Sequence, residues 1–295
     1  MEWIVKVPAT TANIGPGFDV LGLALDIYNI YKVQSASKFS IQIQGEGAEI
    51  LPKDESNLVV RCFKQILAHY GKQVDPYAFE INNSIPLSRG LGSSASAIIG
   101  AIFLAYQVLN RPLNAHEILK WALPWEGHAD NLTPALLGGL QMVFYQEPDL
   151  HFKKLAIHPD LRAIVVIPEG YISTEQARSV LPKNVALKDC IFNMHRLALT
   201  IQYLEAGDID GLIYSLEDRL HQSYRLKLLS GLWDLFQLLQ KLMCGWVVSG
   251  SGPTLLHFIH KEQTKDILDK IKPLISKSKL QFKARACLPV IHGLL

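Results

Sequence analysis

The chain has 295 residues, of which 49% are hydrophobic, and 29 basic against 27 acidic side chains give it a formal net charge of +2. This length is typical of two domains, and the near balance of charges gives no electrostatic basis for binding nucleic acid or a membrane surface. No run of 18 apolar residues is free of charge, so we expect no membrane-spanning helix.

The first half alternates between strand-like and helix-like segments. Residues 1–6 predict a strand and not a signal peptide. Alternation of apolar and polar residues predicts strands at 27–33 and 39–44, which could pair as antiparallel neighbours. The remaining expected elements of this half are a helix at 57–70 closed by Gly71, a strand at 78–81, a helix over 97–109, a helix at 115–122 capped by Asn114, and a strand at 140–145.

The polar segment 146–159 contains two prolines, and we place a domain boundary there, which gives domains 1–155 and 156–295. The second half opens with a buried strand at 163–167, and an apolar stripe from Leu187 to Leu204 predicts a long helix. Mixed helices and strands with antiparallel pairs indicate an α+β fold in both halves. The other expected elements are helices at 209–221, 233–243 and 262–275, a hairpin formed by 246–248 and 254–258, and a strand at 280–285.

The most informative motif is the glycine-rich stretch 86–96, which leads into the apolar helix. Gly90 and Gly92 allow a tight turn and close approach of a ligand, and Ser93 and Ser94 occupy the expected N-cap position. Such a helix N-terminus offers free N–H donors and a positive dipole end, which suit a phosphate. A Walker loop is excluded because no lysine follows the second glycine, and the dinucleotide-binding fingerprint is incomplete. The stretch therefore indicates nucleotide chemistry, and the alternative is a turn that only starts a buried helix.

Two further segments carry polar residues between apolar flanks. The loop 8–22 contains Asn13 and Asp19, which are typical of a substrate loop but also of a wide turn. Segment 125–131 contains Glu126, a carboxylate suited to Mg²⁺. His128 and Asp130 could instead indicate zinc, but no second histidine or cysteine lies at ligand spacing. Asp130 or Asn131 is also expected to cap a helix that runs to Leu137.

Several features have little meaning when taken singly. The glycine turn 249–254 favours an ordinary hairpin loop. Arg178 and Arg225 would matter only if they converged on a carboxylate or phosphate. The four cysteines lie far apart, which indicates core thiols in a reducing cytoplasm and not a disulfide framework.

Taken together, the motifs resemble those of the GHMP small-molecule kinases. That family has an N-terminal Pro-Ala loop, a Pro-x-x-x-Gly-Leu-Gly-Ser-Ser-Ala loop and a late glycine-rich loop. This chain has all three in order, at 8–22, 86–96 and 249–254. The homoserine kinase branch is the most similar, through segments 11–22, 126–131, 173–182 and 224–225. The resemblance implies a two-domain fold, with an N-terminal mixed-sheet α+β domain and a C-terminal ferredoxin-like α+β domain.

The resemblance also implies a function, namely ATP- and Mg²⁺-dependent phosphorylation of the side-chain hydroxyl of L-homoserine in threonine biosynthesis, by a cytoplasmic homodimer. The ATP phosphates would be held by Pro86, Leu87, Ser88, Arg89, Gly90, Leu91, Gly92, Ser93, Ser94, Ala95 and Ser96. Ser94, in preference to Ser93, would join Glu126 in holding Mg²⁺. The substrate site would comprise Asn13, Asp19, His128, Asn131, Arg178, Arg225, Gly250 and Gly252. Asp130, Asn131 and Arg178 are the expected catalytic residues.

Three questions stay open at this point. Some GHMP kinases carry an aspartate base, but Asn131 beside Asp130 leaves open whether this chain has one, and both residues are expected to orient the hydroxyl. Another GHMP kinase acting on a mevalonate-type or other small alcohol is the first alternative, although Asp19 would then lack a cationic partner. The second alternative is a non-catalytic ligand sensor, against which Ser94 and Glu126 argue because a sensor needs no Mg²⁺ ligand.

Overall fold

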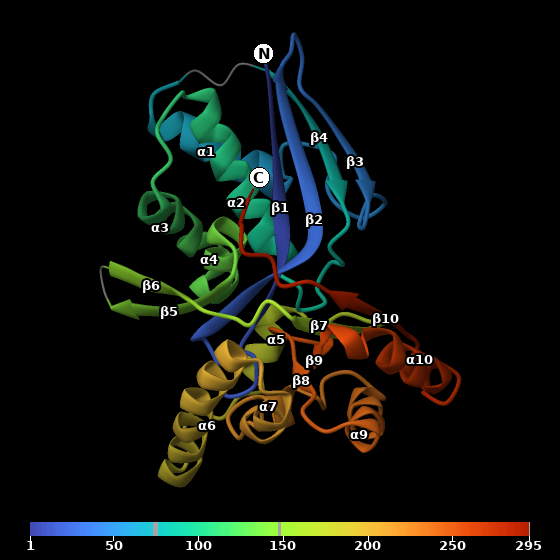
Figure 1. Ribbon diagram of the computed structural model, residues 1–295. Helices are drawn as coiled ribbons and strands as arrows, with labels where there is room; N and C mark the ends of the chain where they lie inside the picture. The colour runs from blue at the N-terminus through green and yellow to red at the C-terminus, as the bar shows by residue number, and fades with distance from the viewer. Residues whose placement is uncertain (73–75, 147–148, 295) are drawn as a thin grey trace.

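The computed structural model describes residues 1–72, 76–146 and 149–294, which form two sheets with helices on their faces (Figure 1). The strands of the first sheet are β1 (Glu2–Ala12), β2 (Leu21–Ser35), β3 (Ser40–Gly45), β4 (Tyr77–Asn83), β5 (Leu140–Gln146) and β6 (Asp149–Leu155). The helices of this half are α1 (Leu58–His69), α2 (Ser93–Val108), α3 (Ala115–Glu126) and α4 (Ala129–Leu137).

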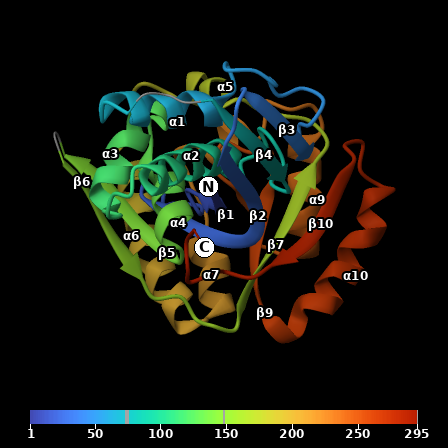
Figure 2. The same ribbon diagram turned by 90° about the horizontal axis from the view of Figure 1, so that it is seen from above.

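The second half carries the second sheet. Its strands are β7 (Leu161–Pro168), β8 (Val247–Val248), β9 (Leu255–His260) and β10 (Phe282–Cys287). Its helices are α5 (Thr174–Ser179), α6 (Leu187–Ala206), α7 (Ile209–Ser215), α8 (Gln222–Arg225), α9 (Leu232–Leu242), a short 3₁₀ turn η1 (Lys261–Gln263) and α10 (Thr264–Ile275). Two views at right angles place the β5–β6 hairpin and α10 at opposite sides of the molecule (Figures 1 and 2).

The strand orders confirm the expected fold class. The first sheet has the order β3-β4-β2-β5-β6 with β1 paired to β2, and it is mixed because β3 and β4 run parallel. The second sheet is antiparallel with the order β10-β7-β9-β8. Numbered along the second half, this order is 4-1-3-2, which is that of a ferredoxin-like domain.

One expected pairing is wrong. The strands at 27–33 and 39–44 do not pair with each other, because β4 lies between them, antiparallel to β2 and parallel to β3. The alternation of apolar residues shows which face of a strand is buried but carries no information about which strand is its neighbour. The polar segment 146–159 also contains a strand that we did not expect, β6, which pairs with β5.

Two expected helix starts and one helix end also require correction. The N-cap of α2 is Gly92, with φ +69°, so Ser93 and Ser94 are already helical. The N-cap of α4 is His128, and Asp130 lies in the first turn. The helix expected over 209–221 ends at residue 215.

The early end of that helix has a local cause. The Asp218 carboxylate accepts the backbone N–H groups of Leu220, His221 and Gln222 at 2.8–3.1 Å. These bonds hold a turn where the apolar spacing predicted continued helix, because a short acidic side chain competes with the helical backbone for donors.

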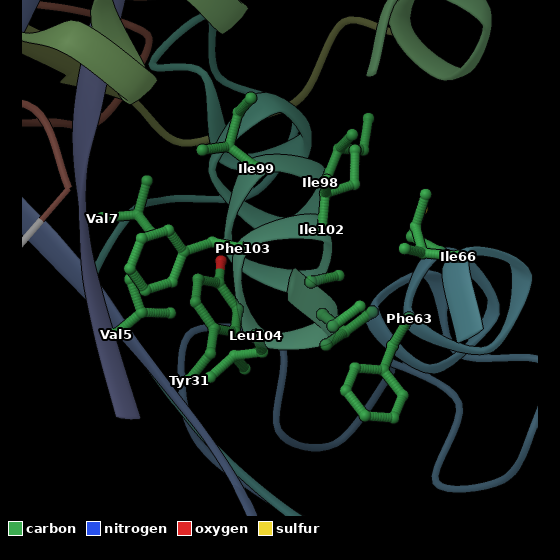
Figure 3. Close-up of a cluster of buried hydrophobic side chains, with 14 of the residues drawn as sticks. Val5, Val7, Tyr31, Phe63, Ile66, Ile98, Ile99, Ile102, Phe103 and Leu104 are labelled. Atoms are coloured by element: carbon green, nitrogen blue, oxygen red, sulfur yellow. The ribbon is translucent and has the colours of Figure 1, made fainter. Parts of the chain in front are cut away.

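Helix α2 is the centre of the first core. It is apolar on all sides, which is typical of a fully buried helix and explains why its sequence lacks an amphipathic pattern. Figure 3 shows its isoleucine, phenylalanine and leucine side chains surrounded by residues of β1, β2 and α1. The labelled members are Val5, Val7, Tyr31, Phe63, Ile66, Ile98, Ile99, Ile102, Phe103 and Leu104.

A second core joins the two halves of the chain. It combines Ala9, Leu23 and Leu25 of the long β1–β2 hairpin with Val165 of β7 and Phe258 of β9. The end of the chain also returns to the first half, where the Val290 N–H donates to the Ala24 carbonyl at 3.1 Å. The first sheet ends at residue 155 and the second begins at 161, and the division into domains 1–155 and 156–295 stays a prediction.

Among the helices of the described residues, none is both long and apolar enough to cross a membrane.

Candidate active site

A cavity of about 410 Å³ lies where the two halves meet. Most residues that the sequence singled out line it, whereas Pro86, Ala95, Ser96 and Gly252 do not. The expected site residues that line the cavity are Asn13, Asp19, Leu87, Ser88, Arg89, Gly90, Leu91, Gly92, Ser93, Ser94, Glu126, His128, Asp130, Asn131, Arg178, Arg225 and Gly250.

The N-terminus of α2 faces this cavity without a side-chain cap. Gly92 adopts a left-handed conformation and, lacking a side chain, leaves the first N–H groups of the helix without an intramolecular cap. Gly92 also lies so close to the Thr10 hydroxyl that a Cβ would overlap it. The first turn of α2 therefore presents free donors and the positive dipole end to the cavity, as an anion site requires.

The second half of the chain holds the glycine loop in place. The Ser249 hydroxyl donates to the Gly90 carbonyl at 2.6 Å, and the Arg89 Nε donates to the Gly170 carbonyl at 2.8 Å. A Cβ on Gly90 would overlap the Ser249 carbonyl oxygen. The late glycine turn at 249–252 is thus packed directly on the phosphate-loop candidate, although the two are about 160 residues apart in sequence.

Ser94 and Glu126 meet at one wall of the cavity. Ser94 lies in the first turn of α2, Glu126 is the last residue of α3, and the serine hydroxyl donates to Glu126 Oε2 at 2.7 Å. Burial raises the pKa of Glu126, and the hydrogen bond from Ser94 partly offsets this rise. Across the described ranges no lysine, arginine or histidine forms an ion pair with Glu126. The site therefore has an uncompensated carboxylate beside a hydroxyl oxygen.

Two guanidinium groups from the second half enter the same cavity. Arg178 of α5 pairs with Asp19, with 2.6 Å between its NH2 and Asp19 Oδ1. Arg225 of α8 is only 3% exposed and donates to the carbonyls of Gly250 at 2.8 Å and Ala177 at 3.4 Å. No carboxylate in the described part of the chain lies within ion-pair distance of Arg225.

The electrostatics of Arg225 follow from this arrangement. Burial and the nearby charge of Arg178 lower its pKa to about 10, so the side chain remains a cation at neutral pH. Its hydrogen-bond partners among the described residues are two backbone carbonyls and the Nδ1 of His221, none of which carries a full negative charge. Such a buried cation favours an incoming anion, and the guanidinium fork matches a carboxylate.

The substrate-loop candidate is held in a specific conformation by Asn13. Asn13 and Asp19 both have positive φ, at 73° and 58°, a conformation that Asn and Asp tolerate better than most residues. The Asn13 amide donates to the Gly250 carbonyl at 2.8 Å, and its Oδ1 accepts the Asp19 N–H at 3.1 Å. Asn13 therefore connects the N-terminal loop to the late glycine turn and sets the position of Asp19.

Asp130 and Asn131 lie at the start of α4, against β2. Asp130 is 3% exposed, and a Cβ on Gly22 of β2 would overlap its carbonyl oxygen, so the helix and strand backbones are in direct contact. Asn131 Oδ1 accepts the Thr10 hydroxyl at 2.7 Å. Burial, together with the nearby Asp19 carboxylate, raises the pKa of Asp130 to about 7.

The raised pKa of Asp130 predicts a pH-dependent cost to stability. An unfolded aspartate has a pKa of about 3.9. Between that value and about 7 the native state keeps a proton that the unfolded state releases, so this residue lowers stability progressively as pH rises. In the protein without nucleotide or metal, Asp130→Asn should unfold like the parent at pH 4 and be about 2–4 kcal/mol more stable at pH 8.

Urea denaturation of both proteins across this range measures the effect. Asp234→Asn, at an exposed position on α9, is the matched control and should show no such pH-dependent gain. A stability difference between Asp130→Asn and the parent that stays constant from pH 4 to 8 would contradict the prediction.

Two residues that contact the cavity's lining had no signal in the sequence. Thr10 sits in a stretch that we interpreted as loop but that extends β1, and His221 was assigned to a helix that ends before it. His221 is fully buried, stacks on Phe18 with 5.0 Å between ring centroids, and approaches Arg225 NH1 at 3.4 Å. An apolar part of the lining comes from the loop before α1, from the start of α1 and from β4, through Leu51, Pro52, Leu58, Val59 and Ile81.

Comparisons with known proteins agree with the motifs found in the sequence. Residues 57–139 match the family model described as GHMP kinases N terminal domain. A homoserine kinase of Moorella thermoacetica is 39% identical over 263 residues, 89% of each chain. A homoserine kinase of Petrotoga mobilis is 37% identical over 293 residues, 98% of this chain and 94% of the relative.

Solved structures of similar proteins have the same fold as this chain. The crystal structure of homoserine kinase from Cytophaga hutchinsonii superimposes with a TM-score of 0.87 at 27% identity, covering all of this chain and 96% of the other. A mevalonate kinase structure at 16% identity, with a TM-score of 0.72 and coverage of 98% and 99%, shares the fold.

Proposed function

This chain belongs to the homoserine kinase family of the GHMP kinases, and from that membership we propose that it transfers the γ-phosphoryl group of ATP to the side-chain hydroxyl of L-homoserine. One observation carries the proposal from the structure itself. Within the part of the chain that the structure describes, a helix N-terminus without a side-chain cap, a carboxylate without a cationic partner and a buried arginine without a carboxylate partner line the same cavity.

The proposed ATP site follows the length of the cavity. The N–H groups of the glycine loop and of the first turn of α2 would bind the phosphates. The apolar part of the lining near Leu58 and Val59 would accept the base, because a flat heterocycle needs apolar contact and few polar partners.

Ser94 and Glu126 fit the requirements of Mg²⁺. This ion takes oxygen ligands, keeps several waters and needs only one or two protein groups, and the two side chains offer a hydroxyl and a carboxylate oxygen 2.7 Å apart. The carboxylate lacks a cationic partner in the described residues, so its charge is available to a metal. When bound, the metal would neutralise charge on the β- and γ-phosphates.

The remaining polar groups suit an amino acid. Arg225 offers a buried guanidinium to the substrate carboxylate, and Asp19 offers a carboxylate to its ammonium. Arg178, which is paired to Asp19, lies close enough to Arg225 to lower the pKa of Arg225. Both guanidinium groups therefore lie at the same end of the cavity. We assign His128, a further lining residue, to this substrate end.

The proposed chemistry is a direct transfer. The homoserine hydroxyl oxygen forms a bond to the γ-phosphorus while the bond from that phosphorus to the β–γ bridging oxygen breaks, and ADP leaves. Asp130 and Asn131 orient the hydroxyl, with Asn131 held by Thr10, and the hydroxyl proton passes to phosphate or water. Such transfers depend mainly on positioning and charge neutralisation, so no covalent intermediate is needed.

A coupled ADP-release assay with ATP and Mg²⁺ tests the substrate. We expect turnover with L-homoserine and none with mevalonate, galactose or L-serine. Turnover with another alcohol would keep the phosphate-loop assignment and overturn the amino-acid site. ATP binding without turnover on any of the four would support the sensor alternative.

Asp130→Asn tests whether this residue is a base. Because we assign it to orientation, we expect the KM for homoserine to rise about tenfold while the single-turnover rate at saturating substrate stays within a few-fold of the parent. Rapid-quench measurement of phosphohomoserine separates the two quantities. A fall of about 10²–10⁴ in the single-turnover rate, the usual contribution of general acid–base catalysis, would instead identify Asp130 as the base.

The homodimer and the cytoplasmic location stay predictions. Light scattering on the purified protein measures the first. Fractionation of the source cells measures the second.

A further inference from the structure

We propose that His158, Asp160 and His260 form a binding site for a divalent transition metal, with zinc the best fit, away from the cavity described above. Each residue offers one ligand atom, and these atoms all lie within 4.8 Å of one another. Ligand atoms bound to one ion at about 2.0–2.2 Å are at most about 4.4 Å apart, so a small rotation of these side chains would bring all three to bonding distance. None of the three residues lines the active-site cavity.

The fold holds the three residues together through the backbone. Leu161 at the start of β7 pairs with His260 at the end of β9, so the loop that carries His158 and Asp160 lies next to His260. The His158 N–H donates to the Leu204 carbonyl at 2.8 Å, and the Asp160 carbonyl accepts the Lys261 N–H at 2.8 Å. The backbone positions of the three residues are therefore set before any metal binds, which reduces the entropy lost on binding.

The surroundings of His260 match those of a metal ligand. Its Nδ1 lies 2.7 Å from Glu262 Oε2, which places a carboxylate on one ring nitrogen and leaves Nε2 for a metal. A carboxylate that accepts the second ring N–H fixes the tautomer and increases the basicity of the ligating nitrogen. His158 is restrained by packing, because a Cβ on Gly207 would overlap its ring.

Two contacts would be exchanged when a metal binds. Lys261 Nζ lies 2.6 Å from Asp160 Oδ1, and this exposed pair contributes little to stability, so a divalent ion can replace the ammonium. The Asp160 N–H donates to His158 Nδ1 over a long 3.3 Å, a weak bond that ligation through this nitrogen would break.

Two imidazoles and one carboxylate select the class of metal. Nitrogen ligands favour zinc, nickel, copper or cobalt over magnesium and calcium, which prefer all-oxygen sites. Three protein ligands leave the remaining position to water. The ion would join the loop before β7 to the end of β9 and so stabilise the second sheet.

Titration calorimetry with ZnCl₂ on the full-length, nucleotide-free protein tests the proposal. We expect one zinc per chain, absorption bands of four-coordinate cobalt when Co²⁺ replaces zinc, and a melting temperature that rises by several degrees at zinc about 100 times Kd. Glu262→Gln should weaken binding by about 10- to 100-fold, and His158→Ala or His260→Ala by more.

The controls separate this site from the others in the chain. His195→Ala, an exposed histidine on α6, should leave zinc affinity unchanged. Lys261→Ala, which removes the competing ammonium, should tighten binding several-fold. Zinc held by the active-site carboxylates would persist in His260→Ala and disappear in Glu126→Gln, and that result would overturn the proposal, as would binding at millimolar zinc only.

Discussion

Glu126→Gln is expected to lower kcat by about 10³-fold while the protein stays folded. The substitution keeps the size of the side chain and its hydrogen bond with Ser94 but removes the carboxylate charge that would hold Mg²⁺. A catalytic metal contributes several kcal/mol of charge stabilisation in the transition state, and each 1.36 kcal/mol corresponds to a factor of ten in rate. Steady-state kinetics with homoserine over a range of Mg²⁺ concentrations measures the loss.

The dependence on Mg²⁺ identifies the cause. If Glu126 holds the metal, raising Mg²⁺ should restore part of the activity of Glu126→Gln. Glu117→Gln, the same change at the other end of α3 and outside the cavity, should keep the parent kcat and Mg²⁺ dependence. A parent-like kcat in Glu126→Gln would show that this carboxylate has no part in phosphoryl transfer.

Arg225→Met is expected to lower kcat/KM for homoserine by about 10²–10³-fold, with little change in ATP binding. Removing one partner of a buried charge pair costs about 2–5 kcal/mol, and the loss falls on binding of the substrate carboxylate. The free protein should not lose stability, because Met fills similar volume and removes a buried cation that has no carboxylate partner among the described residues.

Kinetics and thermal unfolding together test this prediction. Arg225→Lys should recover only part of the activity, since an ammonium keeps the charge but not the planar fork. Arg219→Met, a more exposed arginine paired with Asp189 at 3.4 Å, is the matched control and should bind homoserine normally. An unchanged KM for homoserine in Arg225→Met would contradict the assignment of the carboxylate site.

Those parts of the fold that depend on local patterns could be predicted from the sequence. The period of apolar residues predicted α1 and α6, the helices α3, α9 and α10 were also expected, and Asn114 was correctly assigned as the cap of α3. The β8–β9 hairpin was also confirmed. These features depend on residues within a few positions of one another, so their signals survive in a single sequence.

Two of the errors share a physical origin in contacts between distant residues. The insertion of β4 between β2 and β3 depends on which sheet edge is free, and the true N-cap of α2 depends on Gly92 packing against Thr10 of β1. A third error has a local cause: His221 was placed in a helix because its neighbours have helical spacing, yet the turn held by Asp218, three residues earlier, decides its position.

By itself the sequence determined that this protein is a two-part α+β chain with a phosphate loop and an acidic segment in the order typical of GHMP kinases. Motif order along the chain carries that information, because each loop follows its own strand or precedes its own helix. Only the tertiary structure decided that Arg225 is a buried cation with no carboxylate partner among the described residues, and that Glu126 lies against Ser94. It also decided that His158 and His260 lie side by side. The physical reason is that the environment of a charge and the geometry of a ligand site depend on side chains that are tens to hundreds of residues apart in sequence. Local patterns carry no information about contacts between residues so far apart in the chain.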